Sequence, residues 1–183
     1  MAHDRGDVLT EQLLAAAGGD RLALSAVVRA LYPEVVRYCA VRVAPEVADD
    51  VAQDVFLRVT RSAGSFRGDS SARTWVFAVA RNTCADAVRR RVRTRGREVV
   101  ADVGTDHADT LDTAHAQPGA GDGLDLALLL DELDPDRREA FTLTQLSGLS
   151  YAEAAEVLAV PIGTIRSRVS RARGDLVALL ERA

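Results

Sequence analysis

The sequence predicts an all-α protein of two small helical domains joined by a flexible acidic linker. Apolar residues recur at helical spacing, no long segment alternates with the period of a strand, and one stretch near the middle loses its apolar pattern. The 183 residues fit one ordinary domain or two small ones, and the 48% that are apolar can form cores. We place the first domain at residues 1–97, the linker at 98–123 and the second domain at 124–183.

Helical patterns fill the first domain. An amphipathic helix is expected over residues 25–43, kinked or divided at Pro33, and a second helix over 45–61 opens at a proline. Residues 62–71 contain two glycines, which is typical of a loop. A long helix over about 72–93 then completes the domain.

The linker and the start of the second domain follow from composition and capping signals. Residues 98–123 contain glycines, acids and only scattered apolar residues, so they cannot bury enough surface to offset the entropy of ordering. Helical pattern then resumes. Asp134 as an N-cap with Pro135 in the first turn begins a helix that Gly148 ends.

A helix-turn-helix is predicted near the C-terminus. Ser150 and Glu153 have the spacing of a capping box, which opens a helix of about two turns over residues 151–158. A second helix over about 163–180 follows after a very short break, and two helices joined so closely must cross steeply.

The exposed face of that second helix has a composition suited to DNA. Arg can bridge both acceptors of a guanine edge for about 1–3 kcal/mol of discrimination, and hydroxyls and other Arg side chains contact phosphates. The N-terminal residues of a recognition helix enter the major groove, whereas later residues lie nearer the backbone. A solvated face on an ordinary helix is the alternative. The candidate residues are Thr164, Arg166, Ser167, Arg168, Arg171 and Arg173.

The net charge of −4 conceals a strong polarity. By segment, the charge is −1 over residues 1–80, +6 over 81–97, −11 over 98–136 and +2 over 137–183. A basic helix face with aromatic residues near its start is typical of a nucleic-acid surface, so the net charge does not exclude DNA. Core packing is the alternative for Trp75, and a solvated face is the alternative for the Arg residues. The residues of this helix that we single out are Trp75, Asn82, Asp86, Arg89 and Arg90.

Acidic residues alternate with apolar residues over 49–57. Acids beside Phe56 and Leu57 are typical of a surface on which a partner helix with a basic rim docks. A solvated acidic face fits the same spacing equally well.

Other functional classes lack support in the sequence. No apolar run could span a membrane, and we expect a cytoplasmic protein in which Cys39 and Cys84 are reduced packing residues. There is no P-loop, nucleophile elbow or Cys/His cluster, so we expect neither an enzyme nor a bound cofactor. One group of metal-ligand residue types lies in the predicted linker, where no rigid scaffold would fix their geometry. They are Asp102, Asp106, His107, Asp109, Asp112 and His115.

Three runs together resemble the extracytoplasmic-function sigma factors, the smallest class of the bacterial sigma-70-type family. The runs are DDVAQDVFLR at 49–58, TWVFAVARN at 74–82 and PIGTIRSR at 161–168. The resemblance covers about residues 20–97 and 124–180. One departure concerns Ala159, which stands where relatives commonly have Gly in the turn of the helix-turn-helix. If this turn requires a positive φ, alanine costs about 1 kcal/mol there.

The resemblance implies specific partners and roles. The partners would be promoter DNA, core RNA polymerase through its β′ clamp helices and β flap, and an anti-sigma factor. The C-terminal helix would read the −35 element, while the linker would thread the polymerase toward the RNA exit path. The implied clamp-docking residues are Asp50, Gln53, Asp54 and Leu57. The implied −10 residues, including a loop that captures a flipped base, are Arg67, Asp69, Trp75, Asn82, Asp86, Arg89 and Arg90.

A conventional dimeric helix-turn-helix regulator is the alternative. It would be a dimer and would bind its operator tightly without a partner. A sigma factor would bind promoter DNA weakly alone and strongly only with core polymerase.

Overall fold

The computed structural model describes residues 2–101 and 126–182, and every regular element within these ranges is a helix. This confirms the predicted all-α class. The predicted linker lies outside the described residues from position 102 onward, so its flexibility stays a prediction. Within the described ranges, no helix combines the length and the apolar character that crossing a membrane requires.

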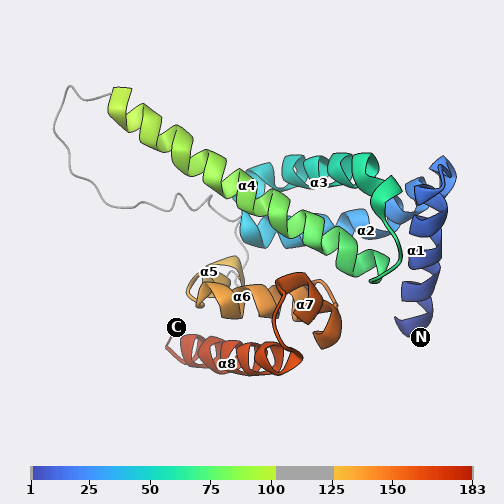
Figure 1. Cartoon of the computed structure of the whole chain (residues 1–183). Coiled ribbons are helices and arrows are strands. Elements are labelled where there is room, and N and C mark those ends of the chain that lie inside the picture. Colours follow the sequence, from blue (N-terminus) through green and yellow to red (C-terminus); the bar gives the residue numbers. More distant parts are fainter. Residues whose placement is uncertain (1, 102–125, 183) are drawn as a thin grey trace.

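The N-terminal domain is a helical bundle. Its described helices are α1 (Ala2–Ala17), α2 (Arg21–Arg42), α3 (Ala48–Ser62) and α4 (Ala72–Ala101). Single 3-10 turns at Pro45–Val47 and Ala63–Ser65 flank α3. Helix α4 extends beyond the predicted end near residue 93, and Figure 1 shows its C-terminal part projecting past the bundle.

Helix α2 begins at a cap and continues through a proline. The Asp20 carboxylate accepts hydrogen bonds from the backbone N–H groups of Leu22 and Ala23 at 2.8 and 3.0 Å. The helix boundary considered at Pro33 is wrong, because α2 runs on to Arg42. An interior proline costs about 3 kcal/mol, and burial on both sides of it offsets that cost. The buried residues of α2 are Val27, Leu31, Val35, Tyr38 and Cys39.

The C-terminal domain contains α5 (Leu126–Asp131), α6 (Pro135–Phe141), a π-helical segment (Thr142–Leu146), α7 (Tyr151–Leu158) and α8 (Ile162–Leu180). Asp134 caps α6 as predicted, since its carboxylate accepts from the N–H groups of Asp136 and Arg137 at 3.1 and 3.2 Å. Gly148 has a φ of 69° and redirects the chain after the π-helical segment, which confirms its role as a terminator.

Both ends of α7 are defined by local hydrogen bonds. The Ser150 hydroxyl accepts from the Glu153 N–H at 3.2 Å, and the Glu153 carboxylate accepts from the Ser150 N–H at 2.8 Å, which confirms the capping box. At the other end Ala159 is left-handed, with φ 53° and ψ 44°. The Val160 N–H then donates to the Ala155 carbonyl at 3.0 Å, as in a Schellman motif. The turn therefore requires a positive φ at a residue that is not glycine.

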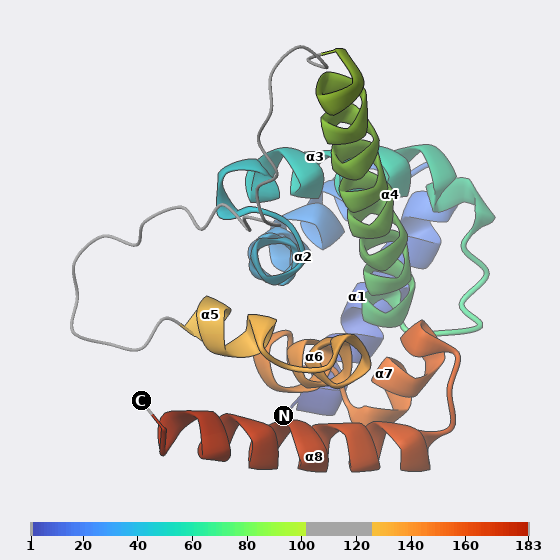
Figure 2. The same cartoon turned by 90° about the vertical axis from the view of Figure 1, so that its left-hand side faces the viewer.

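The two domains pack directly against each other. Helix α7 contacts α4, the π-helical segment contacts α2, and one apolar core contains residues of both domains. Figure 2 shows α6 and α7 beneath the N-terminal bundle and α8 on the far side of the C-terminal domain. The contact between α7 and α4 therefore places the helix-turn-helix beside the predicted −10 helix.

Candidate nucleic-acid interface

Helix α8 presents a basic face to solvent. Its apolar residues Ile165, Val169 and Ala172 are buried, which turns the opposite side of the helix outward. In Figure 2 this helix lies at the bottom of the view, below α6 and α7. Of the six candidates on α8, Thr164 and Arg168 are half-buried and Arg166, Ser167, Arg171 and Arg173 are exposed.

Two of these Arg side chains are held within the domain. Arg168 forms an ion pair with Asp136 at the start of α6, and Arg173 donates to the side-chain oxygen of Gln145 at 2.7 Å. Arg166 and Arg171 make no ion pair with any residue that the structure describes. These two guanidinium groups can therefore bind a polyanion without first breaking an ion pair.

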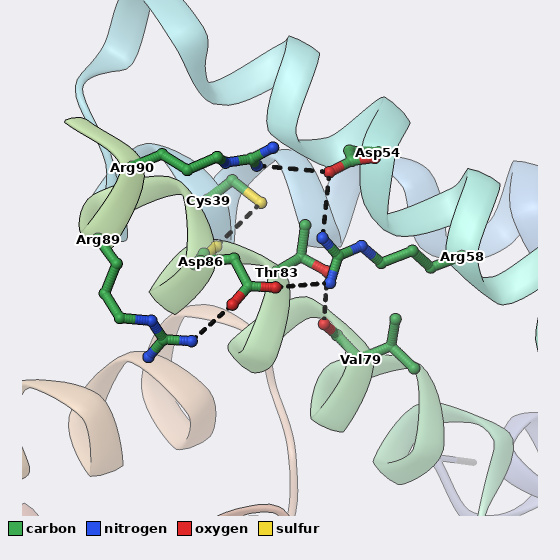
Figure 3. A network of polar contacts seen from close by, with 9 residues as sticks. Cys39, Asp54, Arg58, Val79, Thr83, Asp86, Arg89 and Arg90 are labelled. Carbon is green, nitrogen blue, oxygen red and sulfur yellow. Dashed lines mark hydrogen bonds and ion pairs between the residues drawn. The ribbon is translucent and has the colours of Figure 1, made fainter. Parts of the chain in front are cut away.

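The exposed side of α4 holds the second group of candidates. Asn82, Arg89 and Arg90 are exposed, and Asp86 is half-buried. The Asp86 carboxylate accepts hydrogen bonds from Arg58 at 2.8 Å and from Arg89 at 2.5 Å (Figure 3). These two bonds lower the pKa of Asp86, so the carboxylate remains charged at neutral pH and orients both Arg side chains.

The same ion-pair network reaches the predicted polymerase-binding residues on α3. The Asp54 carboxylate lies 3.5 Å from an Arg58 nitrogen and 3.6 Å from an Arg90 nitrogen (Figure 3). A residue predicted to bind protein is therefore linked to residues predicted to bind DNA. The other members of the α3 group are exposed, and they are Asp50, Gln53 and Leu57.

The loop before α4 is exposed at its tip and anchored at its base. Arg67 and Asp69 are exposed, whereas Phe66 is buried and its ring lies 5.5 Å from the ring of Trp75. Gly68 has a φ of 80°, a conformation that glycine adopts without strain. Trp75 is half-buried, so it both packs against the loop and keeps an accessible edge.

Contacts from the C-terminal domain meet this end of α4. The Ser71 hydroxyl donates to the Glu153 carboxylate at 2.9 Å, and Arg73 donates to the Ser147 carbonyl at 2.6 Å. Arg73 also pairs with Glu34 of α2 at 2.9 Å. Sequence reasoning missed these contacts, because their partners are distant in the chain and no local pattern marks them.

Glu139 forms a second polar connection between the domains. This residue of α6 is buried, and one of its carboxylate oxygens accepts from the Tyr38 hydroxyl at 3.3 Å and from Arg81 at 3.1 Å. The same oxygen lies 3.5 Å from Arg42. Burial raises the pKa of Tyr38, which therefore stays a neutral donor. Three donors from α2 and α4 thus converge on one acid of the C-terminal domain.

Comparison with known proteins identifies the family. Residues 27–94 match the family model of Sigma-70 region 2, and residues 123–176 match that of Sigma-70, region 4. The ECF RNA polymerase sigma factor SigC of Mycobacterium tuberculosis is 41% identical over 172 residues, which cover 94% of this chain and 91% of the relative. The chain belongs to the extracytoplasmic-function (ECF) sigma factors of the sigma-70 family. The ECF RNA polymerase sigma-E factor of Escherichia coli K12 is 34% identical over 134 residues, covering 68% of this chain and 69% of the relative.

Solved structures share the fold of this sigma factor over most of its length. CnrH in complex with the cytosolic domain of CnrY matches with a TM-score of 0.71 and 25% identity, covering 96% of this chain and 98% of CnrH. RpoE in complex with the anti-sigma factor NepR from Bartonella quintana matches with a TM-score of 0.63 and 33% identity, covering 84% of this chain and 94% of RpoE.

These similarities establish the general function. The protein is an ECF sigma factor that directs promoter-specific transcription initiation by RNA polymerase. The matches to regions 2 and 4 do not support a conventional dimeric regulator. Among the described residues, no group of three or more His, Cys, Asp or Glu side chains could hold a metal ion. The acids and histidines between positions 102 and 115 lie outside those residues.

Proposed function

We propose that the protein divides promoter recognition between two separate surfaces and binds core polymerase through a third. Residues 1–97 form the unit for the −10 element and the β′ clamp helices, and residues 124–183 form the unit for the −35 element and the β flap. The segment 98–123 connects the two units. The basic face of α8, fixed outward by its buried stripe, is the observation that carries this assignment.

The −35 surface centres on the N-terminal half of α8. Arg166 is exposed one residue after buried Ile165, so it projects from an anchored position into the space that a major groove would occupy. Arg171 lies further along the same helix and suits a phosphate contact. Arg168 and Arg173 would exchange their partners Asp136 and Gln145 for DNA, which makes them weaker contributors.

The −10 surface combines the exposed side of α4 with the preceding loop. Arg89 and Arg90 supply positive charge for the backbone, and Asn82 supplies an amide that can bond a base edge. Asp86 acts by holding Arg89 in place. The exposed tip at Arg67 and Asp69 would contact a base that has left the stack.

The polymerase surface is the exposed side of α3. Leu57 has 54% of its side chain exposed, although it belongs to a helix whose other large apolar residues are mostly buried. An exposed leucine flanked by Gln53 and Asp54 is typical of a helix that docks on a partner helix. A basic rim on the partner would complement Asp50.

An anti-sigma factor is the proposed regulator. Both CnrH and RpoE match this chain across most of their lengths in structures of complexes, and the protein bound to RpoE is the anti-sigma factor NepR. The closed packing of the two domains supports regulation of this kind, because Ser71 and Arg73 at the −10 end are engaged by the C-terminal domain.

Run-off transcription with core polymerase tests the −35 assignment. Arg166→Ala should reduce transcription from a −35-dependent promoter by about 5- to 150-fold, corresponding to about 1–3 kcal/mol. Arg182→Ala, an exposed Arg just beyond α8, is the matched control and should leave transcription unchanged. Both variants should bind core polymerase like the wild type. Loss of core binding by the Arg166 variant would contradict its placement on the DNA surface.

Competition for core polymerase tests the α3 surface. Leu57→Ala should weaken holoenzyme assembly by about tenfold, since an apolar anchor at an interface contributes about 1–2 kcal/mol. Leu22→Ala on α2 is the control, because Leu22 is 83% exposed and lies outside the proposed surface. Equal affinities of the two variants would remove Leu57 from the interface.

A further inference from the structure

The only two cysteines of the chain lie side by side in the core of the N-terminal bundle. Cys39 of α2 and Cys84 of α4 are both fully buried, and their sulfur atoms are 3.6 Å apart. In the view of Figure 3, Cys39 appears between Arg90 and Asp86 of the ion-pair network. The two residues are 45 positions apart in sequence, so the fold alone brings them together.

The geometry permits a covalent bond with little rearrangement. A disulfide has a sulfur–sulfur distance of about 2.0 Å, so the two sulfur atoms must approach by roughly 1.5 Å. Side-chain rotation and a small shift of two helices can supply this distance. Because α2 and α4 already pack in one core, bond formation requires no rearrangement of the domains.

The surroundings distinguish the two thiols. The hydrogen bond between them lowers the pKa of Cys84 and raises the pKa of Cys39, and the positive charge of Arg42 lowers the pKa of Cys84 further. Burial and, to a smaller extent, Glu139 act in the opposite direction on Cys84. Since a thiolate is the reactive form of cysteine, Cys84 is the better nucleophile of the pair.

We propose that Cys39 and Cys84 form a dithiol that a hydroperoxide oxidises to a reversible intrachain disulfide. The Cys84 thiolate attacks the peroxide, which forms an S–O bond, breaks the O–O bond and leaves Cys84 as a sulfenic acid. The hydroxide released in this step leaves as water with the proton that Cys84 gave up. The Cys39 sulfur then attacks Cys84, forming the S–S bond and expelling hydroxide, which leaves as water with the Cys39 proton. Two thiols and one hydrogen peroxide thus give one disulfide and two waters, and a dithiol reductant reverses the change.

The location of the pair connects oxidation to the contact between the domains. Tyr38 and Arg42 lie one and three residues from Cys39, and Arg81 lies three residues before Cys84. These are the three side chains that converge on Glu139. A disulfide between α2 and α4 therefore fastens together the two helices that carry all three donors.

Mass spectrometry of the full-length protein tests the proposal. On graded exposure to hydrogen peroxide, the intact protein should lose the mass of two hydrogen atoms and regain it with dithiothreitol. After trypsin under non-reducing conditions, the peptides of residues 38–42 and 82–89 should appear as one cross-linked species. The proposal is overturned if peroxide at levels that fully oxidise glutathione leaves both thiols reduced, as shown by their alkylation once the treated protein is denatured. It is also overturned if disulfides form only between chains.

Single-cysteine variants test which sulfur reacts first. In Cys39→Ser, whose hydroxyl can still donate to the Cys84 sulfur, Cys84 should form a sulfenic acid that dimedone traps, and in Cys84→Ser the trapping of Cys39 should be slower. Circular dichroism confirms that each variant is folded. Equal trapping of the two variants would overturn the assignment of Cys84, and the wild-type cross-link tests the pair independently of any variant.

Discussion

Replacing Ala159 by Gly should stabilise the protein. Ala159 ends α7 in a left-handed conformation, with φ 53° and ψ 44°, and it is the only non-glycine residue with a positive φ among those that the structure describes. In this conformation the Cβ atom of an L-residue crowds the following carbonyl oxygen. Glycine removes that crowding while the hydrogen bond from the Val160 N–H to the Ala155 carbonyl can persist.

The size of the effect follows from two opposing terms. The crowded Cβ costs about 1–2 kcal/mol, and glycine loses about 0.5–1 kcal/mol more backbone entropy than alanine when the chain folds. Ala159 is exposed, so the lost methyl group removes little packing. The net gain in the free energy of unfolding should be about 0.5–1 kcal/mol, which corresponds to a rise of about 1–4 °C in Tm for a chain of this length.

Urea unfolding followed by circular dichroism measures this gain, with two matched controls. Ala152→Gly places the same substitution at an exposed, right-handed position of the same helix and should destabilise by up to about 1 kcal/mol. Gly148→Ala introduces a Cβ where φ is 69° and should also destabilise. If Ala159→Gly were no more stable than the wild type while both controls behaved as expected, the argument from the left-handed turn would be refuted.

Two further predictions concern polar contacts between the domains. Glu139→Gln removes the charge that faces two Arg side chains, so the contact between the domains should weaken by about 1–2 kcal/mol. The radius of gyration measured by small-angle X-ray scattering should then increase, and an unchanged radius would contradict this prediction. Burial of Glu153 opposes ionisation, but hydrogen bonds from Ser150 and Ser71 prevail and lower its pKa below the ordinary 4.5. Its stabilisation is therefore present above pH 4.5 and lost as the pH falls through the folded-state pKa, so the difference in unfolding free energy between wild type and Glu153→Gln should shrink as the pH is lowered below 4.5.

Local signals made the helix-turn-helix predictable. The capping box at Ser150 and Glu153 and the buried stripe of α8 depend on residues within a few positions of one another, and the structure has both. At Ala159 the signal was a departure from the sigma factors that the sequence resembles, and the structure has there the positive φ at which alanine is strained. By contrast, Pro33 did not end α2, because packing on both sides outweighs the local preference of proline.

Long-range pairing was not predictable from spacing. Tyr38 and Glu139 are 101 residues apart, and an amphipathic stripe shows only that a face is buried, not which element covers it. For the same reason the basic face of α8 looked uniform in sequence, although Arg168 and Arg173 are paired within the domain. The sequence therefore indicated residue types suited to DNA but did not show which of these side chains are paired within the domain.

The polar contacts at the proposed −10 end of the molecule bear on whether the closed arrangement of the two domains could open. Arg73 is held by a carbonyl of the C-terminal domain and by Glu34, and a DNA phosphate could replace the carbonyl as its partner. Each such hydrogen bond contributes about 1 kcal/mol net, comparable with a single DNA contact, so DNA could replace this polar part of the domain contact, whereas the shared apolar core would also have to separate. If only about one molecule in a hundred were open, the apparent affinity of the isolated protein for a promoter would fall about a hundredfold. A partner that binds only the open form, as core polymerase would through α3, would restore the promoter affinity lost to closure. We therefore expect the protein to bind a promoter weakly alone and strongly in the holoenzyme.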